Sequence, residues 1–259
     1  MARKNPHPEP EPELRIRGLV ESGVQLASGL PADHDALLAV VLDALRSCDA
    51  GVIAGDWDEV RKAGLLWNAA VWKLNGETFD GCRDDRNPKA AGLLVDRLCR
   101  AIPGTPPLWG QLGEFVIEVN GVRCLVECGH GFGGLHSLHF NFYAVDLDRP
   151  FISDTGYRSH FADAVAGSTV LAAAESAFSG YLVGKKRIVL SAEARDRMAD
   201  RPLPFWCSNL NPAPARRPAT CAIPDGYALV DVVLPLHQAF IVKRWAEAAE
   251  RKRATIRQH

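Results

Sequence analysis

The sequence predicts an α+β fold, in which an antiparallel meander sheet is covered by N-terminal helices and followed by a C-terminal helix. Apolar residues recur at helical spacing from residue 33 to residue 102, and the pattern then changes to the two-residue period of strands. An Asn-Gly pair, typical of a two-residue hairpin, separates two of the alternating runs. We expect a single domain over residues 14–259, because too little chain follows the proline-rich stretch near the C-terminus to form a second one.

The first two helices are predicted from their capping residues. Residues 1–13 are rich in proline and glutamate and should form a disordered tail. The first helix is expected after Asp33, because leucine and valine then recur at helical spacing. The second is expected from Asp56, with Glu59 in the capping-box position, to the Asn-Gly pair at 75–76.

A third helix is predicted to begin at Asn87-Pro88 and to end before the proline-rich turn at 103–107, since proline cannot continue a helix. Together the three helices can cover the apolar face of a sheet. The expected buried stripe of the third helix consists of Leu93, Leu94, Leu98 and Ile102.

The sheet is predicted from three alternating runs. Residues 115–119 and 122–127 flank Asn120-Gly121, and a third run follows at 138–145. Short connections favour antiparallel neighbours, so the three runs should form a meander. The expected buried face of the third strand consists of Leu138, Phe140, Phe142 and Ala144.

The rest of the chain is predicted to alternate between short elements. The expected order is a helix at 169–182, a strand at 187–190, a helix at 192–199, a proline-rich loop at 201–224, a strand at 227–234 and a closing helix at 237–256.

The composition and charge of the chain exclude several classes of protein. The net charge of -1 excludes a uniformly basic nucleic-acid-binding protein, although it is compatible with a local basic face. No apolar run approaches the roughly 20 residues that span a bilayer, and the N-terminus has no segment of the signal-peptide kind. Seven cysteines, an odd number, indicate reduced thiols. We therefore expect a cytoplasmic protein with no membrane partner, and the sequence leaves the oligomeric state open.

One cluster of cysteines and histidines has the composition of a zinc site. We expect Cys124 and Cys128 to share one strand face, with His139 opposite Cys124 and His130 in the loop between the strands. Thiolate and imidazole ligands suit tetrahedral zinc, with His136 as a further candidate. The alternative is that the two cysteines are small buried hydrophobic residues and the histidines ordinary strand residues. No other cofactor is predicted.

A glycine-rich segment at 129–134 has the composition of a phosphate cradle. Such cradles bind anions through a helix N-terminus directly behind them, whereas here the pattern continues into a strand. The sequence is therefore also compatible with a simple hairpin loop.

The segment 146–160, expected to be a loop, is dense in side chains that form hydrogen bonds. Its two arginines could hold an anion, and its hydroxyl groups could add hydrogen bonds; the alternative is a structural turn capped by aspartates. The candidate binding residues are Arg149, Ser153, Asp154, Thr155, Tyr157 and Arg158.

The predicted closing helix is basic. Such a helix can bind nucleic acid or an acidic partner, although basic residues also complement the dipole at a helix C-terminus. The candidate binding residues here are Lys243, Arg244, Arg251 and Arg253.

Two stretches carry a resemblance to a known group of proteins. These are Pro-Leu-Trp-Gly-Gln at 107–111 and, more distinctively, Asp-Arg-Pro-Phe at 148–151 running into Thr-Gly-Tyr-Arg-Ser at 155–159. The region 107–159 resembles uncharacterised proteins borne on plasmids and mobile elements of GC-rich proteobacteria. The resemblance implies an accessory protein of a mobile element, and no activity or catalytic residue comes with it.

The sequence supports two hypotheses of different classes. Because no catalytic motif is found, including the Gly-x-Ser-x-Gly elbow, the leading hypothesis is a non-enzymatic accessory binding protein of a plasmid, phage or other mobile element. It would engage nucleic acid or a host protein. The alternative is a zinc-dependent hydrolase or a zinc-stabilised domain.

Overall fold

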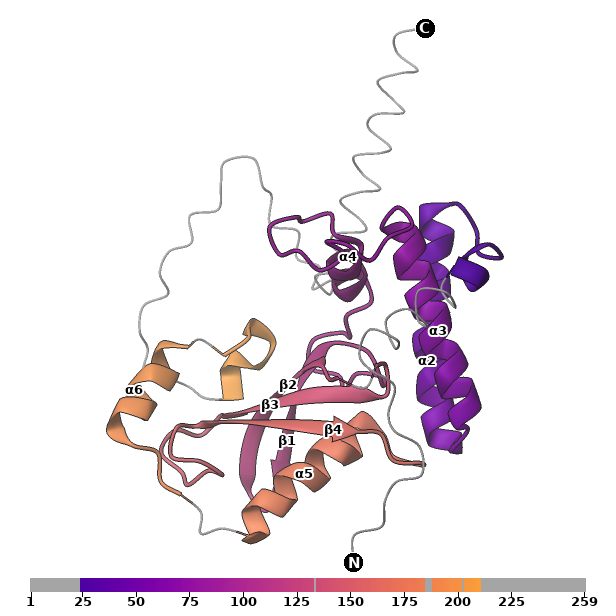
Figure 1. Ribbon diagram of the computed structural model, residues 1–259. Helices are drawn as coiled ribbons and strands as arrows, with labels where there is room; N and C mark the ends of the chain where they lie inside the picture. Colours follow the sequence, from indigo (N-terminus) through magenta and orange to yellow (C-terminus); the bar gives the residue numbers. More distant parts are fainter. Residues whose placement is uncertain (1–23, 133, 185–187, 202, 211–259) are drawn as a thin grey trace, which may run out of the picture.

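A computed structural model describes residues 24–132, 134–184, 188–201 and 203–210 (Figure 1). In this part of the chain, helices precede and follow a four-stranded antiparallel sheet, so the predicted α+β class is confirmed. The elements are α2 (His34–Ala54), α3 (Trp57–Leu74), α4 (Ala91–Leu98), β1 (Gly113–Val119), β2 (Val122–His130), β3 (Ser137–Ala144), β4 (Tyr157–Asp163), α5 (Val170–Gly184), α6 (Ala192–Asp200) and the 3-10 helix η1 (Phe205–Leu210).

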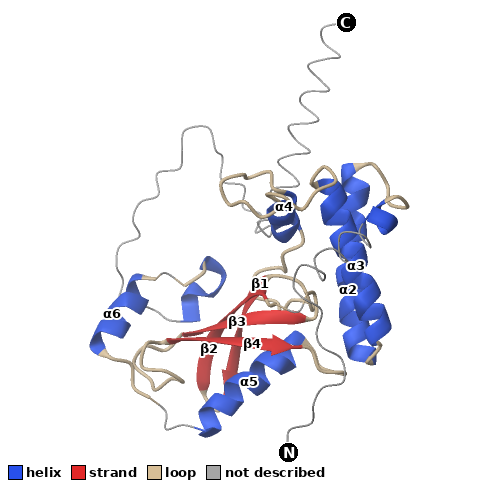
Figure 2. Ribbon diagram, viewed as in Figure 1, coloured by secondary structure: helices blue, strands red, loops and turns tan. Residues whose placement is uncertain are grey.

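Helices α2 and α3 form an antiparallel hairpin whose starts agree with the sequence prediction (Figure 2). The carboxylate of Asp33 accepts a hydrogen bond from the amide of Ala36 at 2.9 Å, and Asp56 accepts one from Glu59 at 3.0 Å. Each bond satisfies an amide that has no partner within its helix. Between the helices, Gly55 adopts a φ of 72°, the left-handed conformation that ends α2.

Helix α4 is shorter than predicted, and its expected buried stripe is partly wrong. The helix ends at Leu98, so Ile102 lies beyond it, and both side chains are exposed, at 39% and 44%. The buried residues of α4 are instead Ala91, Gly92 and Val95. The reason is tertiary, because small residues on this face let the preceding turn pack directly against the helix.

Gly92 is the point of closest approach between that turn and α4. Its amide donates to the carbonyl oxygen of Cys82 at 2.8 Å, and a Cβ on Gly92 would lie 2.7 Å from the same oxygen. A side chain there would force the backbone of the turn to move, although alanine is the better helix former by about 1 kcal/mol.

We predict that Gly92→Ala lowers the free energy of unfolding by about 1–3 kcal/mol, because steric overlap with backbone outweighs helix propensity. Gly64→Ala is the matched control, since a Cβ on Gly64 in α3 would meet nothing within 4 Å. This control should be neutral or stabilising by up to about 1 kcal/mol. Urea denaturation of both variants measures the difference, and equal effects would contradict the prediction.

The sheet has the strand order β1-β2-β3-β4, with every neighbouring pair antiparallel. The predicted hairpin between β1 and β2 is confirmed, with Asn120 at a φ of 52° and Gly121 at 73°. The segment 157–163 is the fourth strand, so the prediction of a loop through residue 160 was wrong there. β4 lies at the edge of the sheet, and its inner positions include Arg158 and His160. Because these inner residues are polar, the sequence of β4 lacks the usual alternation of apolar and polar residues.

The inner face of the sheet is mostly apolar, and α5 packs against it. Phe178 of α5 contacts Phe142 of β3 and Phe151, with ring centroids 5.4 and 5.6 Å apart. Buried residues of α2, α3 and α4 belong to the same hydrophobic cluster. The predicted inner face of β3 is confirmed, because its four members are all buried: Leu138, Phe140, Phe142 and Ala144.

Trp109 joins this core to the segments around it. Its side chain is fully buried, and its indole N–H donates to the carbonyl of Ser168 at 2.7 Å. Its backbone amide donates to the carboxylate of Asp49 in α2 at 3.1 Å. One residue therefore links α2, the approach to β1 and the segment that leads into α5.

The later elements agree with the prediction where they are described. Helices α5 and α6 lie at the expected positions, and the strand expected at 187–190 is reduced to a single bridge between Ile188 and Phe151. None of the helices in the described ranges combines the length and apolar character that crossing a bilayer requires. The tail at 1–13, the strand at 227–234 and the helix at 237–256 lie outside the described residues, and the single domain stays a prediction.

Candidate functional site

The basic side chains of α2 and α3 are neutralised locally. Three of them pair with an acid three residues earlier on the same helix: Arg46 with Asp43, Arg61 with Asp58, and Lys62 with Glu59. A further cation, Lys73, donates to the backbone carbonyls of Ala27 and Leu30 at 2.9 and 2.7 Å. The long helical hairpin therefore offers little free positive charge to an anionic partner.

Positive charge is instead exposed around α4. Lys89, Arg97 and Arg100 are all exposed, and within the described ranges no carboxylate forms an ion pair with any of them. We call these three residues the α4 basic surface. Nearby, Arg86 pairs with Asp84 at 3.0 Å. This surface was not predicted from the sequence, where only the apolar stripe of the third helix was considered, although the density of basic residues between 83 and 100 was a usable signal.

Side-chain hydrogen bonds fix the turn that carries Lys89. Asn75, at the end of α3, donates to the carbonyls of Thr78 and Asp80 at 2.9 and 3.0 Å and accepts from the amide of Ala91 at 3.4 Å. At the other end of the turn, the guanidinium of Arg97 donates to the carbonyl of Pro88. This bond places the side chain of Arg97 beside the residue that precedes Lys89.

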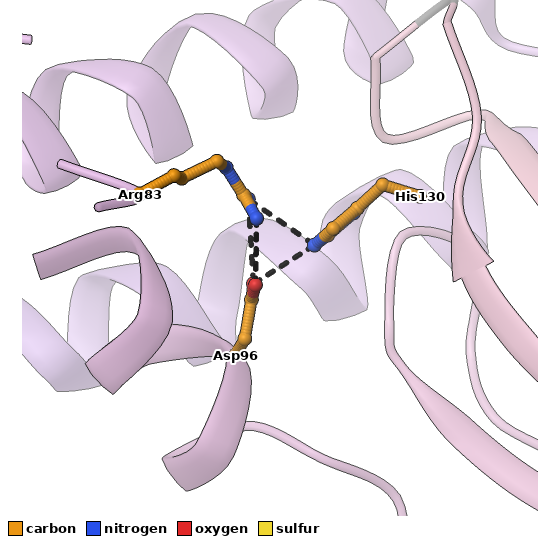
Figure 3. A network of polar contacts seen from close by, with 3 residues as sticks. All are labelled: Arg83, Asp96 and His130. Carbon is orange, nitrogen blue, oxygen red and sulfur yellow. Dashed lines mark hydrogen bonds and ion pairs between the residues drawn. The ribbon is translucent and has the colours of Figure 1, made fainter. Parts of the chain in front are cut away.

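A polar network connects this region to the sheet (Figure 3). Asp96 of α4 pairs with Arg83 through Oδ2 at 2.7 Å and with Nε2 of His130, at the end of β2, through Oδ1 at 2.8 Å. Burial alone would raise the pKa of Asp96, but the hydrogen bonds and charges of His130 and Arg83 outweigh it and lower the pKa below its ordinary value. Asp96 is therefore a stable carboxylate that bonds both a guanidinium and an imidazole.

The structure does not bring the expected zinc ligands together. The predicted register was wrong, because Cys124 pairs with Ala144, and His139 pairs with Gly129 on the opposite face of the sheet. The physical reason is that β2 continues through His130, which is held by Asp96, so the turn to β3 starts later than expected.

The local chemistry at these residues also differs from that of a metal site. Burial raises the pKa of Cys128 to about 12 and that of Cys124 well above its usual value, so both thiols stay protonated. His139 stacks on Phe161 at 4.1 Å, and His136 lies beside Trp57. Across the described residues, no group of three or more His, Cys, Asp or Glu side chains could hold a metal ion.

The candidate binding residues of the segment 146–160 lie in different surroundings. Arg149 is exposed, whereas Arg158 lies on the inner face of the sheet, 4.1 Å above the ring of Tyr181. The hydroxyls of Ser153 and Thr155 both donate to the carbonyl of Tyr157, as in a structural turn.

Two further candidates of this segment make contacts at its margins. Tyr157 points to the outer face and donates to Asn141 at 2.8 Å, and the carbonyl of Asp154 accepts from Ser191.

Because Arg149 is exposed and Arg158 lies on the inner face of the sheet, these two arginines do not form one patch. The other basic candidates lie outside the described residues: Lys243, Arg244, Arg251 and Arg253.

Comparison with known proteins gives two family matches. Residues 23–98 match the family model described as the KlcB N-terminal DNA-binding domain, and residues 112–206 match the KlcB third domain. The first match contains α2, α3 and α4, and the second contains the sheet, α5 and α6. No solved structure matches the chain.

Curated relatives agree with these matches. One Protein KlcB of Escherichia coli is 50% identical over 229 residues, which are 88% of this chain and 57% of the relative. Another is 45% identical over 234 residues, 88% of this chain and 50% of the relative. The chain thus spans about half the length of these relatives. The TrfB transcriptional repressor protein of Escherichia coli is 51% identical over 35 residues, 14% of this chain and 35% of the repressor.

Proposed function

We propose that this chain, whose homologues are KlcB proteins, is a DNA-binding accessory protein of a plasmid or another mobile element of a GC-rich proteobacterium. The protein acts in the cytoplasm by binding rather than by catalysis. The α4 basic surface, formed by Lys89, Arg97 and Arg100, contacts the phosphates of duplex DNA.

One observation carries the assignment of the surface. Acidic residues outnumber basic ones in the stretch 23–98 that matches a DNA-binding family model, so its overall charge repels DNA. Attraction must then come from a local group of cations, because neutralising phosphates with Lys and Arg supplies most of the affinity that does not depend on sequence. Lys89 and Arg97 are the cations of that stretch that remain exposed and free of carboxylate partners among the described residues, and Arg100 follows directly.

The match to a repressor supports the same role. A stretch of 35 residues is 51% identical to a protein named as a transcriptional repressor. We propose that DNA binding by this chain serves the genes of the element that carries it.

We predict that the full chain binds a short DNA duplex with strong salt dependence. Three phosphate contacts give a slope of about -2.7 in log affinity against log salt, or a loss of about 40-fold between 50 and 200 mM. Fluorescence anisotropy of a labelled duplex at several salt concentrations measures the slope. Absence of binding at 50 mM salt, or binding that salt does not weaken, would rule out the proposed function.

A further inference from the structure

Arg158 of β4 is a cation that no carboxylate neutralises within the described part of the chain. Its side chain is half-buried beside α5, which lies alongside β4 in Figure 1, and its guanidinium carbon is 4.1 Å from the centre of the Tyr181 ring. The Nε atom of Arg158 is buried and has no hydrogen-bond partner among the described residues. Because a guanidinium keeps its charge, partial burial without an anion is unfavourable.

The two terminal nitrogens of Arg158 are available to a ligand. Among the described residues, the buried side-chain atoms that lack a partner are Nε of Arg158 and Nε2 of His139. The terminal nitrogens of Arg158 also lack a partner among these residues, so they must reach solvent. The ring of Tyr181 supports the guanidinium from one side and orients the plane of its fork. Arg158 can thus form two parallel hydrogen bonds with one anion.

A third donor comes from the pair formed by His160 and Tyr181. His160 lies on the same face of β4 as Arg158, and its Nδ1 is 2.9 Å from the hydroxyl of Tyr181. A neutral imidazole and a hydroxyl carry one hydrogen each, and the bond between them uses one. The second hydrogen stays free in either tautomer, on the hydroxyl or on Nε2, and protonation of the ring would add another. A donor is therefore present in every protonation state.

The surroundings of His160 agree with an unpaired cation beside it. Burial and the charge of Arg158 both lower the pKa of His160. A carboxylate nearby would act in the opposite direction, and none of the described acids contributes. Arg158, His160 and Tyr181, which we call the β4–α5 cluster, thus combine hydrogen-bond donors with a positive charge that has no anion.

We propose that the β4–α5 cluster binds a phosphate group. A phosphate presents three or more acceptor oxygens, enough for the fork and the third donor together, whereas a carboxylate presents two. Its negative charge also neutralises Arg158. The cluster lies in the stretch 112–206 that matches the KlcB third domain, so its ligand is additional to the DNA contact at the α4 basic surface. The phosphate belongs to a free phosphate compound or to the backbone of bound DNA.

Titration of the wild-type protein with inorganic phosphate at pH 7.5, followed by NMR at constant ionic strength, tests this site. We expect saturable shifts of the Nε–H of Arg158 with half-saturation at about 1–10 mM, as suits a small anion held by a few charge-assisted hydrogen bonds. Arg158→Gln should weaken phosphate binding about 10-fold or more. The matched control is Arg149→Gln, which removes an exposed arginine and should bind phosphate like wild type.

Thermal unfolding gives a second readout that a purely structural role of Arg158 would not change. Addition of 50 mM phosphate in place of chloride should raise the Tm of wild type by about 2–5 °C more than that of Arg158→Gln. Comparing the two rises removes the general stabilising effect of phosphate on folded proteins. Equal rises, or no saturable shift at Arg158 in the wild-type protein, would overturn the proposal, because Arg158 would then only pack on Tyr181.

Addition of a short DNA duplex to the wild-type protein distinguishes the two sources of phosphate. If the duplex shifts the Arg158 signal and inorganic phosphate no longer binds, the site takes a backbone phosphate. If phosphate binds equally with and without the duplex, the site takes a free phosphate compound. A protein that binds phosphate at Arg158 but no duplex at 50 mM salt keeps this site and loses the proposed function. A protein that binds the duplex but no phosphate at Arg158 keeps only the proposed function.

Discussion

Replacing Lys89, Arg97 and Arg100 together by alanine is expected to weaken binding to a short DNA duplex about 100-fold. Each residue that neutralises a phosphate contributes roughly 1 kcal/mol, and three together give about 3 kcal/mol. The salt dependence should flatten by about 2.7 in slope, because three fewer counterions are released. Anisotropy titrations at several salt concentrations measure both quantities.

The matched control removes the same number of positive charges from α2 and α3. Arg46→Ala/Arg61→Ala/Lys62→Ala affects only side chains that already pair with acids on their own helix. We expect this variant to lose less than about 3-fold in affinity, since surface pairs of this kind are screened and weak. An equal loss in both triple variants would show that total charge, and not the α4 basic surface, determines binding.

Arg149→Ala tests the alternative surface, the segment 146–160, which the sequence predicts to bind a partner. Arg149 is exposed and distant in sequence from α4. If Arg149→Ala weakens binding as strongly as the triple change at α4, the contact lies at the segment 146–160 instead.

Replacing Trp109 by alanine is expected to lower the free energy of unfolding by about 3–5 kcal/mol, the range typical of a buried tryptophan. The side chain is fully buried, and its truncation also leaves the carbonyl of Ser168 without its indole donor. Urea denaturation followed by circular dichroism measures the change.

Trp57→Ala is the matched control for this prediction. Trp57 is 44% exposed at the start of α3, so its truncation creates no enclosed cavity and should lower stability by about 1 kcal/mol or less. A Trp109→Ala variant that is as stable as Trp57→Ala would show that Trp109 does not hold the helices, the approach to β1 and α5 together.

Features whose signals are local could be predicted from the sequence. The caps at Asp33 and Asp56 and the hairpin at Asn120-Gly121 each depend on residues within four positions of one another, and all three are confirmed. β4 was not predicted because Arg158 and His160 occupy its inner positions. Both side chains contact Tyr181 of α5, and this contact allows polar residues on the inner face. Propensity and periodicity contain no information about such a partner.

The candidate site was harder to predict for the same reason. Asp96 and His130 are 34 residues apart, and Arg83 and His130 are 47 apart, so only the packed fold shows that they meet. The zinc hypothesis depended on the register of β2 against β3, which the bond between His130 and Asp96 helps to determine. The cations of the α4 basic surface could be read from the sequence, but only the structure shows that they have no ion-pair partners within the described residues.

The close contact at Gly92 has a consequence for the entropy of association. Because the backbone of Cys82 is bonded to the first turn of α4, the segment that presents Lys89 is already ordered before any ligand arrives. Ordering a loop on binding costs about 1–2 kcal/mol per residue, and a frame that is rigid from the outset avoids this loss. Only the rotamers of the basic side chains then remain to be fixed on the ligand, so even a small patch of cations can bind with useful affinity.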